Sequence, residues 1–573
     1  MSAVVVIGAG PIGTCLVERI CANAPQSGRG RVLDLHVVDP YPPGAGRSWR
    51  IGQPGVLRAD SAAGSLTVFT DAATRPVRPG PSLAEWLGSE PEYSASRSEV
   101  GGYLAYAFER VVRGTPANVR VRVHRARAVG LVESAGAQRV ELSTGGQLEA
   151  DAVVLAQGHL DVPPSAAETV EAAFAERHGL TYLPSGRPAD LDLEVVPAGE
   201  PVLIRGAGRA FVDLVTLLTV GRGGRFTEGR QGEPVYLPSG DEPLLYVGSR
   251  RGVPHHARPG YRLAGPLPDL PRFVTAATSA GELRQAVAKE LAYAYYHELF
   301  SRHPARTRTT WETFEAAFTR AEWGDKAMRA LVTKSVPGFA DRLHLDRLEH
   351  PLHGMRFGDL AGLQRWMHGY LAADLERRAD PSFSADLAMI HGLLSARAAL
   401  AAGVATDLWL QRLSGLLAGG PSLARQAELR ALARAGVVTF LGAEPRIEQD
   451  EAAGAWRATS PTVPGLTTAR ALIEARQPAP SVRRSTDPLI AGLFAWGECR
   501  EVSGLLDVRL PDRRLVTRTG AVHDHRFALG PWTAGGIAGF DGPGGIAPLL
   551  RDADALARTV LAQVAGSWLH AAA

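Results

Sequence analysis

Three glycines near the N-terminus have the spacing that binds a dinucleotide. Gly8, Gly10 and Gly13 follow the apolar run at 3–7 and open a stretch with helical periodicity. In such a turn the first glycine permits a tight bend, the second leaves room for a pyrophosphate, and the third lets the helix pack on the strand. Asp39 ends a second apolar run, where a carboxylate can bind a ribose hydroxyl. Residues 3–39 therefore predict a strand, a helix and a strand that bind a dinucleotide at the helix N-terminus.

Two later stretches are expected to reach the same ligand. The loop at 40–50 is rich in turn-forming residues and ends in Trp49 and Arg50, so it can wrap around the dinucleotide or lie on the surface. The buried strand expected from Asp151 onward leads to Gly158, which would let the backbone pass close to the ligand. Between them, the alternating stretches at 119–123 and 137–142 predict strands of one half-exposed sheet.

A second glycine turn follows a linker rich in proline, glycine and charge. Gly206 and Gly208 follow the apolar run at 201–204, but Phe211 stands where a third glycine would be. The next apolar run ends in Ser249, Arg250 and Arg251 rather than in an acid. An arginine can bind a 2′-phosphate that a carboxylate would repel, so these residues favour NADPH over NADH. A solvated surface pair is the alternative interpretation.

Composition limits the class of protein. The chain has 573 residues, 45% of them hydrophobic, and a formal net charge of +3, which predicts two or three soluble globular domains without a nucleic-acid or membrane partner. Three cysteines without C-x-x-C spacing predict no disulfide framework and fit a reducing cytoplasm. The histidines lack metal-ligand spacing, so we expect no metal site.

The remaining periodicity places these motifs in domains. We expect an α/β protein with two Rossmann-like dinucleotide-binding domains. The first spans 1–165 and closes with 481–573, and the second spans 195–480 with a largely helical insertion at about 280–420. The insertion could form a substrate lid or the surface of a homodimer.

The order of the motifs resembles the two-dinucleotide flavoprotein superfamily, in which the first glycine turn binds FAD. Residues 151–159 resemble the D-x-x-x-L-A-T-G-H/Y signature of flavin-dependent N-hydroxylating monooxygenases, with Gln157 in place of the threonine. Residues 525–532 resemble the closing FAD strand, which implies that Gly530, Pro531 and Trp532 lie beside the flavin. Together with the Ser249 to Arg251 run, these features resemble actinobacterial FAD-NAD(P)-binding proteins that include the nitrosuccinate synthases.

The resemblance implies an NADPH-dependent FAD monooxygenase acting with oxygen on the amine of an amino acid, such as aspartate, in natural-product biosynthesis. Flavin supplies the reactive chemistry, so no catalytic residue is assigned. Three alternatives stay open: a flavin-dependent NADPH oxidoreductase, a carbon- or ketone-oxygenating monooxygenase, and a non-catalytic flavin-binding partner protein. Cys15 and Cys21 do not form the pair that a disulfide reductase needs, and the sequence between the two glycine turns lacks the F-x-G-x-x-x-H-x-x-x-W/P fingerprint of Baeyer-Villiger enzymes.

Overall fold

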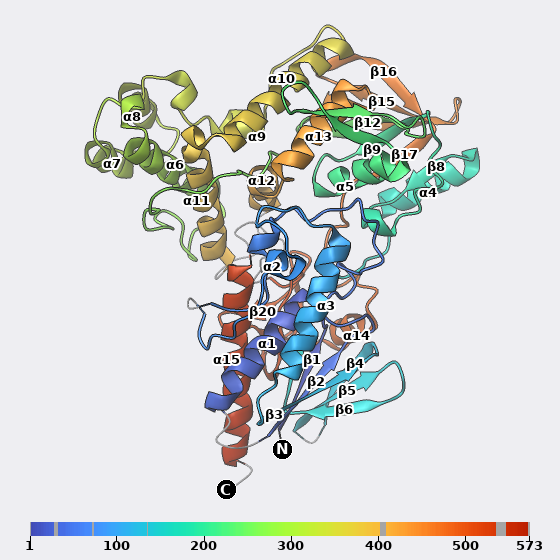
Figure 1. The fold of residues 1–573 in the computed structure, drawn as a ribbon, viewed down its shortest axis with the longest axis vertical. Helices are drawn as coiled ribbons and strands as arrows, with labels where there is room; N and C mark the ends of the chain where they lie inside the picture. Colours follow the sequence, from blue (N-terminus) through green and yellow to red (C-terminus); the bar gives the residue numbers. More distant parts are fainter. Residues whose placement is uncertain are drawn as a thin grey trace. The chain divides into compact units, whose positions relative to one another are not determined.

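The chain divides into two units, and the second is inserted into the first. The computed structural model describes residues 2–27, 32–71, 74–134, 136–401, 408–534 and 546–570. The first unit comprises Met1–Pro163 and Pro478–Ala573, and the second comprises Pro164–Gln477 (Figure 1).

A seven-stranded sheet forms the centre of the first unit, in the order β20-β21-β22-β7-β1-β2-β3. Five neighbouring strands run parallel, and β20 and β21 add an antiparallel edge. The strands are β1 (Ser2–Ile7), β2 (Leu33–Val38), β3 (Val119–His124), β7 (Ala152–Leu155), β20 (Val508–Arg509), β21 (Arg514–Val516) and β22 (Val522–Ala528). The strand β22, from the end of the chain, pairs with β7, so the last segment completes the sheet that the first segment begins.

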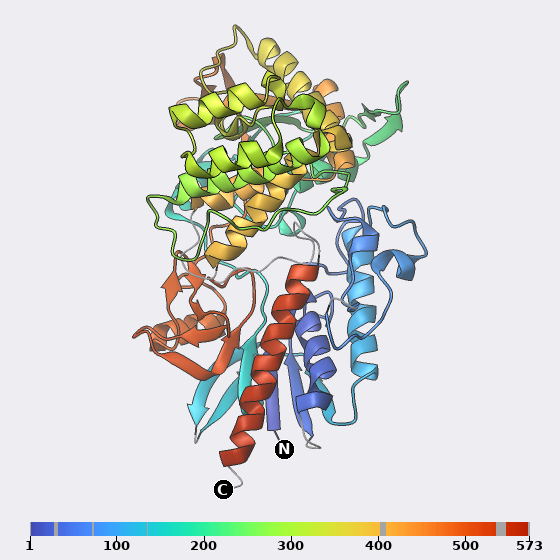
Figure 2. The same cartoon turned by 90° about the vertical axis from the view of Figure 1, so that its left-hand side faces the viewer.

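Alternate residues of β1 belong to two different cores, because successive side chains of a strand point to opposite faces. Val4 and Val6 pack with α1 (Pro11–Ser27), α3 (Arg97–Arg113) and α15 (Ala547–His570). Figure 2 shows α15 running alongside α1. Val5 and Ile7 pack with α14 (Pro488–Trp496) and with a separate antiparallel sheet. That sheet consists of β4 (Ala128–Ser134), β5 (Ala137–Leu142) and β6 (Gln147–Ala150).

The strands expected at 119–123 and 137–142 both form, but they do not share a sheet. The strand β3 is an edge of the seven-stranded sheet, whereas β5 is the middle strand of the antiparallel sheet. Alternating polarity shows that one face of a strand is exposed, but it does not identify the neighbouring strand. The prediction of a common sheet was therefore wrong.

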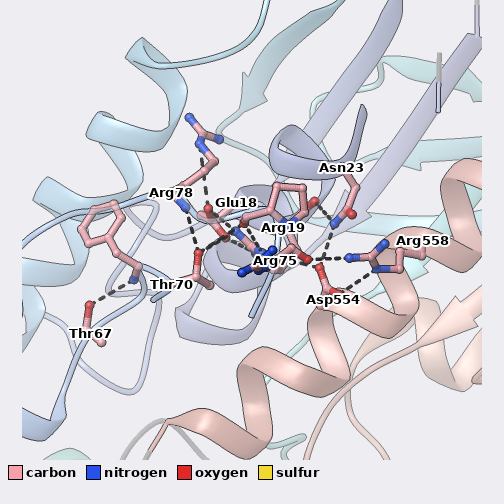
Figure 3. A network of polar contacts seen from close by, with 11 residues as sticks. Glu18, Arg19, Asn23, Thr67, Thr70, Arg75, Arg78, Asp554 and Arg558 are labelled. Carbon is pink, nitrogen blue, oxygen red and sulfur yellow. Dashed lines mark hydrogen bonds and ion pairs between the residues drawn. The ribbon is translucent and has the colours of Figure 1, made fainter. Parts of the chain in front are cut away.

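A buried ionic network joins α1 to α15 and to the segment 67–78 in the first unit (Figure 3). The side chains of Glu18 and Arg19 are fully buried and form an ion pair. Arg19 also lies 3.5 Å from the Asp554 carboxylate of α15 and donates to the Thr70 hydroxyl at 3.0 Å. Asn23 donates to Asp554 at 2.8 Å. These bonds compensate for the cost of burying charge in the core that supports the first glycine turn.

The second unit has its own parallel sheet, in the order β13-β12-β9-β17-β8. Its strands are β8 (Thr181–Leu183), β9 (Pro201–Arg205), β12 (Leu244–Ser249), β13 (Val438–Ala443) and β17 (Ala471–Glu474). Helix α4 (Ala166–His178) precedes the sheet, α5 (Arg209–Leu218) follows β9, and α13 (Leu423–Arg434) leads into β13. A three-stranded antiparallel sheet connects β13 to β17 and comprises β14 (Arg446–Asp450), β15 (Ala455–Ser460) and β16 (Val463–Ala469).

The chain between β12 and α13 is largely helical from residue 283 onward. Its helices are α6 (Leu283–Arg302), α7 (Trp311–Arg320), α8 (Lys326–Ser335), α9 (Leu345–Glu349), α10 (Leu360–Ala379), α11 (Ser384–Ala401) and α12 (Leu408–Ala418). Much of this insertion has a core of its own, rich in aromatic rings, in which Phe300 stacks on Phe314 with ring centroids 4.6 Å apart. In the described ranges, none of the helices has the length and apolar character needed to cross a membrane. The predicted α/β class, with two Rossmann-like sheets and a helical insertion, is confirmed.

Candidate dinucleotide sites

The first glycine turn needs each of its glycines for a different reason. Gly8 has a φ of +109°, and a Cβ there would lie 2.6 Å from the Ala156 carbonyl oxygen. A Cβ on Gly13 would lie 1.9 Å from the Gly8 carbonyl oxygen, so this glycine lets α1 pack against the turn. Around Gly10 there is open space, because a Cβ would meet only the Gly46 Cα, at 3.9 Å. The free space thus lies at the position predicted to face the pyrophosphate.

Asp39 lies at the end of β2, beside this turn. Its two carboxylate oxygens accept hydrogen bonds from the backbone N–H groups of Ala9, at 2.7 Å, and Tyr41, at 2.8 Å. Burial raises the pKa of Asp39, while these two hydrogen bonds act in the opposite direction. The carboxylate therefore fastens the glycine turn to the end of β2. Each oxygen keeps a lone pair for a ribose hydroxyl, so the predicted role of Asp39 fits this geometry.

The loop at 40–50 contacts the turn through glycines that sequence reasoning did not assign. The Gly44 N–H donates to the Ala9 carbonyl at 2.7 Å, and a Cβ on Gly46 would lie 2.9 Å from the Gly10 Cα. Trp49 is half-buried against the core that contains α3, and Arg50 donates to the Arg47 carbonyl at 3.4 Å. The G-x-G spacing of residues 44–46 was the available signal for a second close backbone approach.

The ends of β7 and β22 meet at the same edge of the sheet. Leu529 donates to the Leu155 carbonyl at 2.9 Å, and the Trp532 indole N–H donates to the Gln157 carbonyl at 2.8 Å. A Cβ on Gly530 would lie 2.8 Å from that same carbonyl oxygen, so a larger residue would separate the strand ends. Trp532 is buried in the core, Pro531 is half-buried, and Gly158 is exposed with open space around it.

The Gln157 side chain, at this edge, has a buried amide oxygen, Oε1, without a hydrogen-bond donor among the described residues. Its Nε2 donates to Asp487 at 3.1 Å. Asp487 also accepts from Leu489 and Ile490 and so caps α14. A buried amide oxygen without a donor is costly, and a bound ligand with an N–H group would satisfy it. With the space at Gly10 and the N-terminus of α1, this edge fits FAD.

The second glycine turn has the same local geometry with one substitution. Gly206 has a φ of +126°, and a Cβ there would lie 2.7 Å from the Ala475 carbonyl oxygen. Gly208 precedes α5 without a side-chain cap on that helix. Phe211, in place of the third glycine, is fully buried in the core of this unit. Its ring points into the hydrophobic core, so the first turn of α5 forms without that glycine.

The residues after β12 differ in how firmly they are held. The Ser249 hydroxyl accepts from Gly252 N–H at 3.0 Å within its own turn. Arg251 donates through Nε to the Glu349 carbonyl at 2.9 Å, and its side chain is only 9% exposed. Arg250 is exposed, and its side chain makes no hydrogen bond or ion pair within the described residues. Arg250 can therefore turn to a phosphate without breaking an existing contact.

Comparison with known proteins agrees with this arrangement. A family model described as FAD-NAD(P)-binding matches residues 5–160. The L-aspartate N-monooxygenase (nitrosuccinate-forming) of Streptomyces davaonensis is 36% identical, over 98% of this chain and 97% of that protein. The nitrosuccinic acid synthase npaA of Aspergillus oryzae is 34% identical, over 98% of this chain and 93% of that protein. The L-aspartate N-monooxygenase (nitrosuccinate-forming) of Streptomyces cremeus is 37% identical, over 97% of this chain and 94% of that protein.

Two glycine turns on two parallel sheets, together with this similarity, define a flavin-dependent monooxygenase of the FAD-NAD(P)-binding type. The prediction of an enzyme is confirmed, and the alternative of a non-catalytic binding protein is set aside. More narrowly, the chain belongs to the family of nitrosuccinate-forming L-aspartate N-monooxygenases.

Proposed function

We propose that this protein oxidises the amine nitrogen of L-aspartate with oxygen and NADPH, and that successive oxidations give nitrosuccinate. The supporting observation is identity of 34% to 37%, over nearly the whole chain, to proteins named for this reaction. Because the aligned region includes the helical insertion, the similarity covers more than the two dinucleotide folds.

The first unit would hold FAD, which when bound takes a hydride from NADPH and activates oxygen. Gly10 leaves the space for its pyrophosphate, and the N-terminus of α1 would stabilise the phosphate charge. Asp39 would accept from the ribose, and the free Oε1 of Gln157 would accept from a polar N–H group of the ligand. Trp532 holds the end of β7 through the Gln157 carbonyl and so positions that amide.

The second unit would hold NADPH. Arg250 and Arg251 follow the strand end at which the adenosine ribose is expected, and Arg250 has no competing partner among the described residues. We infer that Arg250 provides most of the preference for the 2′-phosphate. Arg251 is fixed by Glu349 and would contribute its charge from a set position.

The substrate amine must be neutral to react, because an ammonium has no lone pair. An alkylammonium with a pKa of ~10 is mostly charged at neutral pH. A desolvated pocket lowers such a pKa, and arginine side chains can bind the substrate carboxylates in pairs of hydrogen bonds.

The test is to incubate the FAD-loaded protein with NADPH, oxygen and L-aspartate, and to follow NADPH, oxygen, hydrogen peroxide and products together. We expect N-oxidised succinate products with L-aspartate, and NADPH oxidation coupled to their formation. D-aspartate, L-asparagine and L-glutamate serve as matched controls, and the NADPH consumed per product counts the oxidations. Peroxide as the only product with every amine would refute the proposal.

A further inference from the structure

His255 lies against the second glycine turn, although no motif marks it. A Cβ on Gly208 would lie 3.2 Å from its ring Cε1 and 3.3 Å from its Nε2. A Cβ on Gly415 of α12 would lie 3.3 Å from the same Cε1. The ring thus lies close both to the N-terminal end of α5 and to a glycine of α12. A side chain at Gly208 or Gly415 would push it away.

Two buried nitrogen atoms in this part of the second unit make no hydrogen bond within the described residues. The Nδ1 of His255 is buried without a hydrogen-bond partner among the described residues. Nη2 of Arg251 also makes no hydrogen bond there, although its side chain is more than nine-tenths buried and forms a longer ion pair with Glu349, at 3.6 Å. Buried polar groups are nearly always paired in native proteins. With its single proton on Nδ1, the neutral His255 ring can donate to an anion bound at the N-terminus of α5.

The charges around His255 also favour an anion. Burial, followed by the positive charges of Arg251 and Arg209 and the neighbouring His256, lowers the pKa of His255 to about 4, and a backbone hydrogen bond with Gly419 acts in the opposite direction. Arg209 is the first residue of α5, directly after Gly208. An anion bound here would offset this accumulation of positive charge.

The helical insertion fixes the segment that carries His255. Asp374 of α10 lies 2.7 Å from His256 Nδ1 through one oxygen and accepts from the Ala257 N–H at 2.8 Å through the other. Gln426 of α13 donates to Asp374 and to the His255 carbonyl, both at 3.2 Å. Asp374, His256 and Gln426 are all buried. The insertion therefore sets the position of His255 through backbone and buried side-chain contacts.

We propose that His255 binds the pyrophosphate of the nicotinamide nucleotide and that Asp374 is its positioning residue. The pyrophosphate is the part of the ligand expected at the Gly206 to Gly208 turn and the N-terminus of α5. The inference rests on the use of NADPH in the proposed function. It differs from the role of Arg250, because the pyrophosphate is common to NADPH and NADH, whereas the 2′-phosphate is not.

The test measures equilibrium binding of NADP⁺ and NAD⁺ to the FAD-loaded protein by calorimetry. The variants are His255→Leu, His255→Ser and His255→Asn, with Arg250→Ala as the control for the 2′-phosphate. Loss of a hydrogen bond to a charged group corresponds to a roughly tenfold to hundredfold weaker affinity. We expect that loss for both nucleotides in His255→Leu and His255→Ser, and a smaller loss in His255→Asn, whose amide still donates. Arg250→Ala should weaken NADP⁺ binding alone.

FAD content and melting temperature show which variants remain folded. The nucleotide affinity of each folded, FAD-containing variant is then compared with that of His255→Asn. Native affinity, or tighter binding, in folded variants without a ring or amide nitrogen would overturn the proposal. If the native protein oxidises aspartate while these variants bind NADP⁺ normally, only this inference fails. If the native protein neither binds NADP⁺ nor oxidises aspartate, the proposed function fails as well.

A double-mutant cycle tests the positioning role of Asp374. Asp374→Asn should weaken the binding of both nucleotides. In the double variant it should add little to the effect of His255→Leu, because both changes remove the same contact between His255 and the pyrophosphate. A merely structural role would lower the melting temperature without this non-additivity. Fully additive losses of affinity would show that Asp374 does not act through His255.

Discussion

A side chain at Gly10 should remove FAD binding while leaving the folded protein intact. The backbone at this position is not in the left-handed region, and a Cβ would lie 3.9 Å from the nearest atom, the Gly46 Cα. Gly10→Ala should therefore change the free energy of unfolding of the FAD-free protein by no more than about 1 kcal/mol. The same methyl group, and more so the side chain of Gly10→Val, occupies the space predicted for the pyrophosphate.

The matched control is Gly13→Ala, which adds the same atom where there is no space. Its Cβ would lie 1.9 Å from the Gly8 carbonyl oxygen, so α1 must move away from the turn. Overpacking of this kind typically costs about 1 to 3 kcal/mol even without a ligand. The two glycines are therefore expected to differ in the FAD-free state and to agree only in the loss of FAD.

The assay combines denaturant unfolding of the FAD-free proteins with FAD titration followed by flavin fluorescence. In the native protein, FAD at 100 times its Kd should add about 2.7 kcal/mol to the free energy of unfolding, and in Gly10→Val this increment should disappear. The reasoning would be refuted if Gly10→Val bound FAD with native affinity. It would also be refuted if Gly10→Ala destabilised the FAD-free protein as much as Gly13→Ala does.

Three further predictions follow from single contacts. Arg250→Ala should raise the KM for NADPH roughly tenfold to hundredfold and leave that for NADH nearly unchanged, since only NADPH carries a 2′-phosphate; equal effects in steady-state kinetics would contradict this. Arg19→Leu should cost about 3 to 5 kcal/mol in denaturant unfolding because it removes the directly bonded partner of the buried Glu18 carboxylate and leaves the longer ion pair with Arg78, at 3.9 Å, and the double variant with Glu18→Leu should recover part of that loss. Burial raises the pKa of Glu168, but hydrogen bonds from Ser185 and Ser165 outweigh it and hold the value at about 2, against 4.5 for a free glutamate. The carboxylate therefore contributes up to about 3 kcal/mol above pH 4.5, and this contribution is lost as the pH falls from 4.5 towards 2; unfolding of Glu168→Gln should lack that part of the acid dependence.

The sequence by itself identified both glycine turns, because their requirements are local. The roles of Gly8, Gly10 and Gly13 depend on the geometry of one strand, one turn and one helix. The order of the elements around them predicts the α/β class. Phe211 marks the limit of this reasoning. Its substitution for a glycine weakened the second motif, yet the ring packs into the core of its unit and the turn still forms.

Only the tertiary structure decided which distant residues meet at these turns. Trp532 reaches the Gln157 carbonyl because β22 pairs with β7, and Asp374 reaches His256 because α10 of the insertion packs against α13 and β13. Such contacts depend on strand order and helix packing over long separations in the chain. Hydrophobic periodicity reports which face of an element is buried, but not which element covers it. No sequence motif therefore identifies His255, although two glycines, Gly208 before α5 and Gly415 in α12, leave space for its ring.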